Sequence, residues 1–302
     1  NKTSWLLYDW KKMKKIIILI PVYNDWESLN KLLIEINKNI KFFNDINFEC
    51  VIINDASTIK PKELIRPSNI SSVELLNMKE NRGHARCNAF GIRYIFKNKK
   101  FDNLILMDGD GEDRPQEIKI LIEKIRENPN LSVVAKRIKR SEGFFFQFLY
   151  QLHKLITFIF TGQKINFGNF SILIRSDVEK LHSKASLWSS FSGSVKKNLK
   201  PLNEINSIRG IRYFGPSQMS LYKLVIHSFS IIAVFKYIVL LRSAIMLIVL
   251  AYLNSYFGNL TIFSQFLIVV FNLLIFVTSL REQEEGLLNS HNNLDNIQRI
   301  TH

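Results

Sequence analysis

Short apolar runs alternate with helical patterns over the first half of the chain. The expected strands are residues 16–20, 48–53, 72–77, 103–107 and 131–135. The expected helices between them are residues 26–39, 83–96 and 116–127, the last with Pro115 in its first turn. Because strand and helix patterns alternate, the sequence predicts βαβ units in an α/β domain with a mainly parallel sheet.

Two later segments are apolar except for narrow polar stripes. In residues 143–160, Gln147, Gln151 and Lys154 recur every three or four residues and share one face of a helix. This spacing fits either an amphipathic helix at a bilayer or a core helix of the same domain. Residues 221–236 repeat the pattern and are predicted to form an amphipathic helix in the headgroup plane.

The C-terminal third predicts a transmembrane hairpin. Residues 260–280 carry no charge, and at about 1.5 Å per residue such a helix matches a hydrocarbon core of roughly 30 Å. Residues 237–257 form the other expected span, with Arg242 close enough to its start to reach the interface. Lys and Arg gather at the end away from the turn at 258–259, so both termini are expected on the cytoplasmic side. The alternative is a hairpin buried in a soluble fold.

The chain is therefore expected to divide into consecutive parts. These are a tail (1–14), an α/β domain (15–220), an amphipathic helix (221–236), a transmembrane hairpin (237–257 and 260–280) and a second tail (281–302). No signal peptide is expected, because the apolar run at 16–20 is short and leads into Pro-Val-Tyr-Asn. The second tail is expected to be a short exposed helix or unstructured.

Charge and cysteine content narrow the partners. The chain has 41 Lys and Arg against 26 Asp and Glu, a formal +15, which favours nucleic acid, anionic lipid or phosphorylated substrates. No aromatic-basic motif of the usual nucleic-acid modules is present, so nucleic acid is not expected as a partner. Cys50 and Cys87 have no disulfide or zinc spacing, which fits a reducing cytosol.

Acidic residues follow the fourth expected strand. Asp108 and Asp110 stand one residue apart where strand 103–107 leads into a loop, and ligands of parallel sheets gather at such strand ends. Both can supply hard oxygen ligands to Mg²⁺ or Mn²⁺, and Gly109 leaves room for close backbone approach. The alternative is a solvated turn, since Asp-Gly pairs are turn formers.

The first two strands also end in polar residues. Pro21, Tyr23, Asn24 and Asp25 follow the first strand, and Asp55 follows the second. The carboxylates at this edge are suited to accept hydrogen bonds from ribose hydroxyls or base N–H groups of a nucleoside. Taken separately, each segment also fits an ordinary strand-to-helix connection with a capping residue.

Three basic segments are candidates for binding phosphate. Arg82 and His84 open the helix at 83–96, and helix N-termini with Arg attract phosphate. Arg137 follows the fifth strand, and Arg209 and Arg212 precede the amphipathic helix. Arg137 equally fits a surface charge, and the last two also fit a juxtamembrane segment that attracts anionic lipid.

The motifs together, in order, resemble glycosyltransferase family 2 with the GT-A fold. They are IPVYND (20–25), INDAST (53–58), NRGHA..NAFG (81–91), MDGDGEDRP (107–115) and KRIKRSEG (136–143). The resemblance covers about residues 15–220 and implies an inverting transferase with a nucleotide-sugar donor. It makes Asp108 and Asp110 the metal and diphosphate motif, and Asp55 with the 21–25 loop the nucleoside contacts.

The interfacial helices and the hairpin narrow the resemblance to polyprenyl-phosphate glycosyltransferases, similar to dolichyl-phosphate mannose synthases. In that branch a basic loop before the interfacial helix holds the lipid phosphate, which here implies Arg209, Arg212 and Ser217. The chain departs from the pattern at Asn54, where many relatives have Asp, and at Gln218, where relatives often have Lys. A QxxRW motif is absent, which argues against a processive polysaccharide synthase.

The expected function is transfer of one sugar from a nucleotide-sugar to a polyprenyl phosphate or lipid-linked glycan in cell-envelope synthesis. The protein is expected in a bacterial-type inner or plasma membrane, with its catalytic domain cytoplasmic and with homo-oligomers left open. A polyprenyl phosphate is already anionic and needs no base, whereas a sugar hydroxyl needs one, for which Asp113 and Glu142 are candidates. The alternatives are a transferase acting on a polysaccharide or O-antigen hydroxyl, and a nucleotide-binding membrane pseudoenzyme or scaffold.

Overall fold

The computed structural model describes residues 13–60, 63–139, 144–216 and 220–301. Its centre is an eight-stranded sheet with the order β7-β5-β6-β4-β1-β2-β3-β8. The strands are β1 (Lys14–Val22), β2 (Ile46–Asn54), β3 (Ile70–Met78), β4 (Asn103–Leu106), β5 (Val133–Lys139), β6 (Phe167–Ile174), β7 (Asn203–Ile208) and β8 (Leu294–Ile300). β4, β1, β2 and β3 run parallel to their neighbours in that order, so their carboxyl ends meet at one edge.

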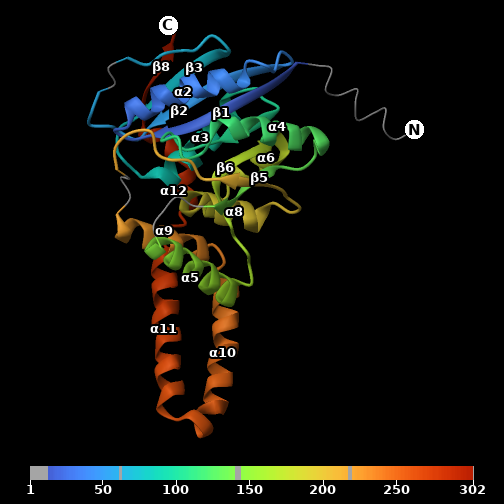
Figure 1. Ribbon diagram of the computed structural model, residues 1–302. Coiled ribbons are helices and arrows are strands. Elements are labelled where there is room, and N and C mark those ends of the chain that lie inside the picture. The colour runs from blue at the N-terminus through green and yellow to red at the C-terminus, as the bar shows by residue number, and fades with distance from the viewer. Residues whose placement is uncertain (1–12, 61–62, 140–143, 217–219, 302) are drawn as a thin grey trace.

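Helices cover both faces of this sheet, as Figure 1 shows. One face packs against α2 (Trp26–Ile40) and α4 (Ile118–Glu127), the latter preceded by the 3-10 turn η2 (Pro115–Glu117). The other face packs against α3 (His84–Asn98) and the short helices α6 (Arg175–Leu181), α7 (Ala185–Ser189) and α8 (Phe191–Asn198). Residues of β1 alternate between the two cores: Ile16, Ile18 and Ile20 face the first and Ile17 and Leu19 the second. A strand buried on both sides is expected to be continuously apolar, as β1 is.

The α/β prediction is confirmed. All five predicted strands and all three predicted helices occur, with boundaries that differ by a few residues; β5, for example, begins at Val133 rather than at 131. The sheet also contains β6, β7 and β8, which the pattern did not predict. β6 runs antiparallel to both β4 and β5, so the sheet is mixed beyond its parallel centre.

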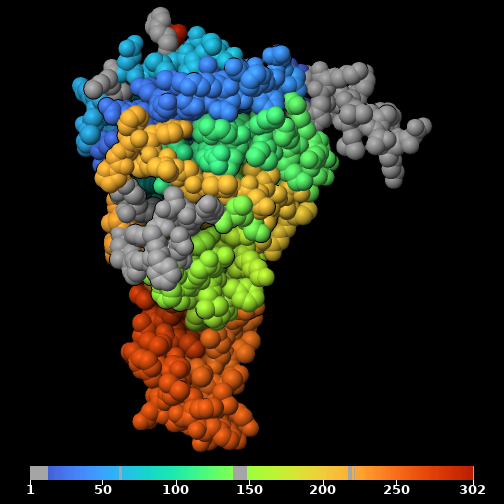
Figure 2. Space-filling model, viewed as in Figure 1, coloured from blue at the N-terminus to red at the C-terminus, as the bar shows by residue number. Residues whose placement is uncertain are grey.

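Four further helices lie below the α/β domain in the view of Figure 1. They are α5 (Phe144–Thr161), α9 (Leu221–Ala233), α10 (Lys236–Phe257) and α11 (Asn259–Ser279). α5 and α9 lie between the α/β domain and the hairpin of α10 and α11, which projects as a stalk (Figures 1 and 2). Among the described residues, two helices are long and apolar enough to cross a membrane, with 11% and 17% of their apolar stretches buried inside the protein. A hairpin buried in a soluble core does not fit such low burial.

The arginine of the first span contacts the end of α5. Arg242 Nη1 donates to the backbone oxygen of Ile159 at 3.1 Å. A Cβ at Gly162, which has φ +69°, would lie 2.5 Å from that guanidinium, so the close approach requires glycine. The charge therefore faces the carbonyl-rich C-terminus of α5, where a cation is stabilised.

The C-terminal tail returns to the sheet. After α11 the chain forms α12 (Glu284–Leu288) and the 3-10 turn η3 (Ser290–Asn293), and then β8 pairs antiparallel with β3. The sequence predicted only a short exposed helix or an unstructured segment here. β8 has five consecutive exposed residues, so it lacks the alternation of buried and exposed positions by which a strand is recognised.

Candidate active site

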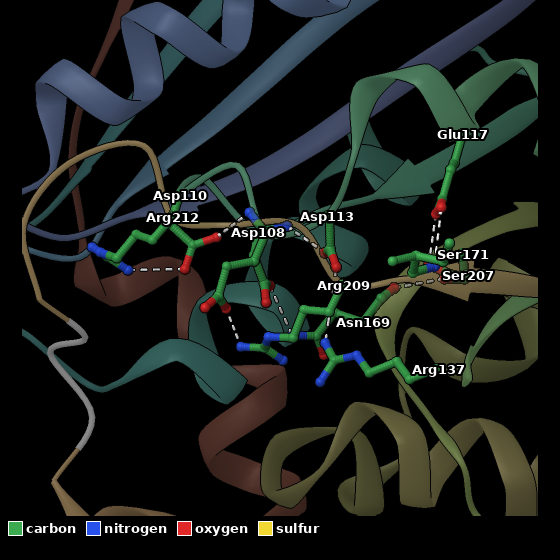
Figure 3. Close-up of polar contacts among 12 residues, drawn as sticks. Asp108, Asp110, Asp113, Glu117, Arg137, Asn169, Ser171, Ser207, Arg209 and Arg212 are labelled. Atoms are coloured by element: carbon green, nitrogen blue, oxygen red, sulfur yellow. Dashed lines mark hydrogen bonds and ion pairs between the residues drawn. The ribbon is translucent and has the colours of Figure 1, made fainter. Parts of the chain in front are cut away.

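The candidate site lies where the loops after β1, β2 and β4 meet. Because these strands are parallel neighbours, their following loops converge at the carboxyl edge of the sheet. Figure 3 shows Asp108, Asp110 and Asp113 gathered there, with Arg209 and Arg212 beside them. The sequence prediction of an acidic cluster at this edge therefore agrees with the fold.

The acidic loop is organised by its own backbone. The N–H of Asp108 donates to Asp113 Oδ2 at 2.9 Å, and the N–H of Glu112 donates to Asp110 Oδ1 at 3.0 Å. Gly111 has φ +87°, and a Cβ there would lie 2.4 Å from the ring of Tyr213. Glycine is therefore required at this position both for the backbone conformation and for the space.

Asp108 is held from the opposite side by neutral and basic groups. Asn169 Nδ2 donates to Asp108 Oδ1 at 3.0 Å, and His84 Nε2 lies 3.2 Å from the same oxygen. Asn88 Nδ2 contacts His84 Nε2 at 3.1 Å, one helical turn further along α3. This arrangement brings the predicted residues His84 and Asp108 together, with Asn169 of β6 as their shared partner.

The basic loop between β7 and α9 is paired with the acidic loop. Arg212 Nη1 donates to Asp110 Oδ2 at 2.9 Å, and its Nη2 is paired with Asp25. Arg209 Nη2 is paired with Glu112 Oε2. The backbone N–H of Tyr213 also donates to the backbone oxygen of Asp110, at 2.9 Å.

Burial and mutual repulsion raise the pKa of two of these carboxyls. Burial, then the charge of Asp108, raises the pKa of Asp110 to about 6 and that of Asp113 to about 7. Burial also raises the pKa of Asp108, but the charge and hydrogen bond of His84 outweigh it and bring that pKa well below its usual range. Burial lowers the pKa of His84, yet the carboxylate of Asp108 leaves it above its usual value.

Arg137 stands at the back of the acidic loop. Its Nη2 lies 3.8 Å from Asp113 Oδ1, and both side chains are largely buried. A Cβ at Gly168 would lie 2.5 Å from the same guanidinium, which packs directly on that backbone. Arg137 is therefore part of the site's charge balance and does not fit the alternative of a solvated surface charge.

The loops after β1 and β2 are tied to each other. The N–H of Asn24 donates to Ser57 Oγ at 2.9 Å, and Asn24 Oδ1 accepts from the N–H of Ile59 at 3.0 Å. Asn24 has φ +54°, a conformation that asparagine tolerates better than most residues. Pro21 belongs to β1, and the side chain of Tyr23 is exposed.

Asp55 joins the β2 loop to the start of α3. Its two oxygens accept from the N–H groups of Arg82 and Gly83, each at 2.8 Å, and the residue is buried. The guanidinium of Arg82 points instead to Glu80 Oε2, at 3.3 Å. The segment predicted to bind phosphate thus presents its backbone to Asp55.

Two of the sequence candidates, Ser217 and Glu142, lie outside the described residues. Sequence reasoning also missed Glu117, a buried carboxylate that accepts from Ser207 Oγ at 2.6 Å and from the N–H of Ile208 at 3.1 Å. This carboxylate fixes the end of β7, from which the basic loop departs. Its place at the start of a helical pattern, next to Gln116, made it look like an ordinary surface residue.

The acidic loop fits a divalent cation that shares its ligands with a phosphate group. Among the described residues, no three His, Cys, Asp or Glu side chains are grouped to hold a metal by themselves. Mg²⁺ typically takes one or two carboxylates and completes its shell with water and substrate phosphates. Asp110 already has a cation against it in the guanidinium of Arg212, which shows that this position favours positive charge.

A family model described as glycosyl transferase family 2 matches residues 17–191. The chain is 29% identical over 175 residues to an uncharacterized glycosyltransferase of Synechocystis sp., covering 55% of this chain and 52% of that protein. It is 25% identical to an undecaprenyl-phosphate 4-deoxy-4-formamido-L-arabinose transferase of Yersinia enterocolitica, covering 71% of this chain and 65% of the relative. The chain thus spans between about half and two thirds of these curated relatives.

Solved structures share the fold. The mannosyl-3-phosphoglycerate synthase of Rubrobacter xylanophilus matches with a TM-score of 0.51 and 12% identity over 76% of this chain and 75% of that one. The glucosyl-3-phosphoglycerate synthase of Mycobacterium tuberculosis, in complex with Mn²⁺, UDP and phosphoglyceric acid, matches with a TM-score of 0.52 and 11% identity over 77% and 81%. These likenesses agree with a GT-A arrangement of the sheet.

Proposed function

The chain belongs to glycosyl transferase family 2, and from this premise we propose that it is a membrane-anchored, inverting glycosyltransferase. It moves one sugar from a nucleotide-sugar to a polyprenyl phosphate or a lipid-linked glycan. The observation that carries this proposal is the acidic loop at the carboxyl edge of the sheet, interlocked with a basic loop that leads into α9. Paired acidic and basic loops are suited to hold a cation, a diphosphate and an anionic acceptor together.

The donor is proposed to bind over the loops after β1 and β2. Asp25 and Asp55 follow the neighbouring strands β1 and β2, whose loops are joined by Asn24 and Ser57, and a nucleoside would lie over these loops beside the acidic loop. Asp108 and Asp110 would hold Mg²⁺ or Mn²⁺. When bound, such an ion would neutralise the diphosphate leaving group.

The acceptor phosphate is proposed to bind to Arg209, Arg212 and Arg137. Their guanidiniums are held close to the acidic loop by carboxylates, and Arg can exchange a carboxylate for a phosphate with the same bidentate geometry. A phosphate acceptor is anionic at neutral pH, so it needs no general base. If the acceptor is a sugar hydroxyl, Asp113 is the described carboxyl suited to take its proton, because its pKa is about 7.

The membrane is proposed as the second partner. α5 exposes Phe148, Leu152, Leu155 and Phe158, spaced at three and four residues, and so presents an apolar face beside the hairpin. α10 and α11 would then cross the bilayer, with the catalytic domain and both described ends of the chain on the cytoplasmic side. The predicted division into a catalytic part (15–220), an interfacial helix (221–236) and a hairpin (237–280) is kept, with β8 added to the catalytic part.

The test is transfer by purified full-length protein in nanodiscs that contain undecaprenyl phosphate. With Mn²⁺ and a panel of UDP- and GDP-sugars, one donor is expected to release nucleoside diphosphate and to give a glycosylated lipid by mass spectrometry. Release that requires a lipid-linked glycan instead of the polyprenyl phosphate would favour the hydroxyl acceptor. Nucleotide binding by calorimetry without transfer to either acceptor would favour a pseudoenzyme and contradict the proposal.

A further inference from the structure

Side-chain amides form a continuous ladder across three strands at the donor edge. Asn296 on β8 accepts at Oδ1 from Asn77 Nδ2, at 2.8 Å, and Asn77 on β3 accepts at Oδ1 from Asn54 Nδ2, also at 2.8 Å. Asn54, at the end of β2, accepts at Oδ1 from the N–H of Ser57 at 2.9 Å. The ladder joins residues that lie more than two hundred positions apart in the chain.

All of these hydrogen bonds run in one direction. Each amide donates toward β8, and the last, Asn296 Nδ2, donates to the carboxylate of Asp295 at 2.7 Å. At the other end the N–H of Asn24 donates to Ser57 Oγ at 2.9 Å, so the β1 loop is included. Hydrogen bonds aligned in this way polarise one another, and a charged acceptor at the end strengthens the series.

A second contact ties the same C-terminal segment to the loop after β3. Asn293 accepts at Oδ1 from the N–H of Glu80 at 3.1 Å and donates from Nδ2 to the oxygen of Glu80 at 2.9 Å. This loop continues to Arg82 and Gly83, whose N–H groups hold the carboxylate of Asp55. The segment that follows the hairpin therefore contacts both connections that shape the proposed nucleoside site.

We propose that β8 is part of the donor site and that Asn296 is a positioning residue, acting on the 54–57 loop through Asn77 and Asn54. The inference rests on the proposed function, because it takes that loop to contact the nucleoside. Asn296 is hydrogen-bonded to Asn77 and Asp295 and to no described residue of the acidic or basic loop, so its effect is expected on nucleotide affinity and not on the transfer step. The site is incomplete when the chain is cut after the hairpin.

The direction of the ladder gives a specific test. Asn296→Ala removes the acceptor for Asn77, whereas Asn296→Asp keeps it. Asn296→Asp also loses the bond to Asp295, but Asp295 is exposed and can turn its carboxylate toward solvent. Asn54→Asp is tolerated only if Asn77 and Asn296 both turn over, so that Asn77 Nδ2 faces residue 54 and Asn77 Oδ1 accepts from Asn296 Nδ2, which then gives up its bond to Asp295. In the double variant Asn54→Asp with Asn296→Asp, Asn77 lies between two carboxylates but has only one NH₂ group to donate. Its carbonyl oxygen must therefore face an oxygen of one of the two carboxylates. Two acceptor oxygens that face each other form no hydrogen bond and repel, so this arrangement is unfavourable.

The experiment is calorimetric binding of UDP and of GDP, each with Mn²⁺, to the full-length chain in detergent. Asn296→Ala is expected to raise the dissociation constant about two- to tenfold, the effect of one lost hydrogen bond, and Asn296→Asp is expected to restore it to within about twofold. The double variant is expected to raise the dissociation constant by a factor about fivefold or more above the product of the factors for the two single Asp variants. Gln298→Ala, two residues along the same strand and opposite Leu75, is the matched control.

Circular dichroism and the melting temperature identify variants that fail to fold, and Asn296→Asp keeps the test open if Asn296→Ala is one of them. Equal nucleotide affinity for the wild type, Asn296→Ala and the double variant would overturn the ladder. Loss of affinity in Gln298→Ala as large as in Asn296→Ala would also overturn it, because any damage to β8 would then suffice. Wild-type protein that binds neither nucleotide would instead contradict the proposed function.

Discussion

On the donor side of the site, the loops after β1 and β2 are tied mainly by neutral groups, whereas the acidic and basic loops on the other side are tied by full charges. Asn54 and Asn77 are joined amide to amide, whereas Arg209 pairs with Glu112 and Arg212 pairs with Asp110. Arg212 also pairs with Asp25 in the loop after β1 and so links the two sides. Neutral hydrogen bonds do not depend on pH, salt or a bound cation, while ion pairs depend on all three. The hydrogen bonds of the donor side are thus in place before a ligand binds, whereas the ion pairs of the charged side can be exchanged for contacts with a metal or a phosphate.

The largest expected effect comes from the charged side. Asp110→Asn or Asp108→Asn removes a carboxylate proposed to hold the metal, and turnover is expected to fall by at least about 100-fold, with Mn²⁺ binding lost in parallel. Turnover is measured as release of nucleoside diphosphate, and Mn²⁺ binding by electron paramagnetic resonance. Asp102→Asn is the control, since Asp102 precedes the same strand, β4, and contacts Lys14 and Lys15 at its opposite end. Undiminished turnover in both site variants would contradict the proposal that these two carboxylates hold a catalytic metal.

The next effect concerns the cation that the protein itself supplies. Arg212→Gln removes the guanidinium from Asp110, so the affinity for Mn²⁺ without nucleotide is expected to rise about tenfold, the value of a charge-assisted hydrogen bond. Arg212→Lys keeps the charge and is expected to stay near the wild type. Arg209→Gln, whose partner is Glu112, is the matched control with a smaller effect. A fall in Mn²⁺ affinity in Arg212→Gln would mean that this arginine does not compete with the metal.

A pH effect is expected on stability in the absence of metal. The pKa of Asp113 is about 7 in the folded protein, raised by burial and by the charge of Asp108 from an ordinary value of 3.8. Between those values the folded state binds more protons than the unfolded state, so the free energy of unfolding falls as the pH rises through this window. For one group the slope is at most about 1.4 kcal/mol per pH unit. Asp113→Asn is therefore expected to show a flatter decline of Tm between pH 4.5 and 7 than the wild type, in detergent with a chelator. Parallel declines would show that Asp113 ionises at its ordinary pH.

The smallest effect compares the two sides directly. Raising the salt concentration from about 0.05 to 0.5 M shortens the screening length and weakens partly buried ion pairs only modestly. Amide exchange at Gly210 and Tyr213, whose N–H groups bond to the acidic loop, is expected to quicken about two- to threefold. Exchange at Ser57, held by Asn54, is expected to stay unchanged. An equal change of the exchange rate at Ser57 and at Gly210 and Tyr213 would contradict the difference between the neutral and the charged side.

Part of the site was predictable because it follows from local order along the chain. Asp55 comes directly after β2, and Asp108 and Asp110 follow β4 within four residues, so the parallel strands place all three at one edge. Their order also resembles the family that the model comparison identified. The partners of Arg209 and Arg212 were not predictable, since basic residues near a membrane are equally suited to lipid phosphate and to carboxylates.

The sequence by itself determined the parallel centre of the sheet, the acidic loop at its edge and the apolar hairpin, because each depends on periodicity or on neighbours within a few residues. Only the tertiary structure decided that β8 returns from the hairpin to pair with β3, and that Asn296 reaches Asn77. β8 is held by backbone hydrogen bonds and carries mostly exposed polar side chains, so nothing in its own pattern marks it as a strand. Contacts of this kind are chosen by the space and the unpaired edge that the rest of the fold presents.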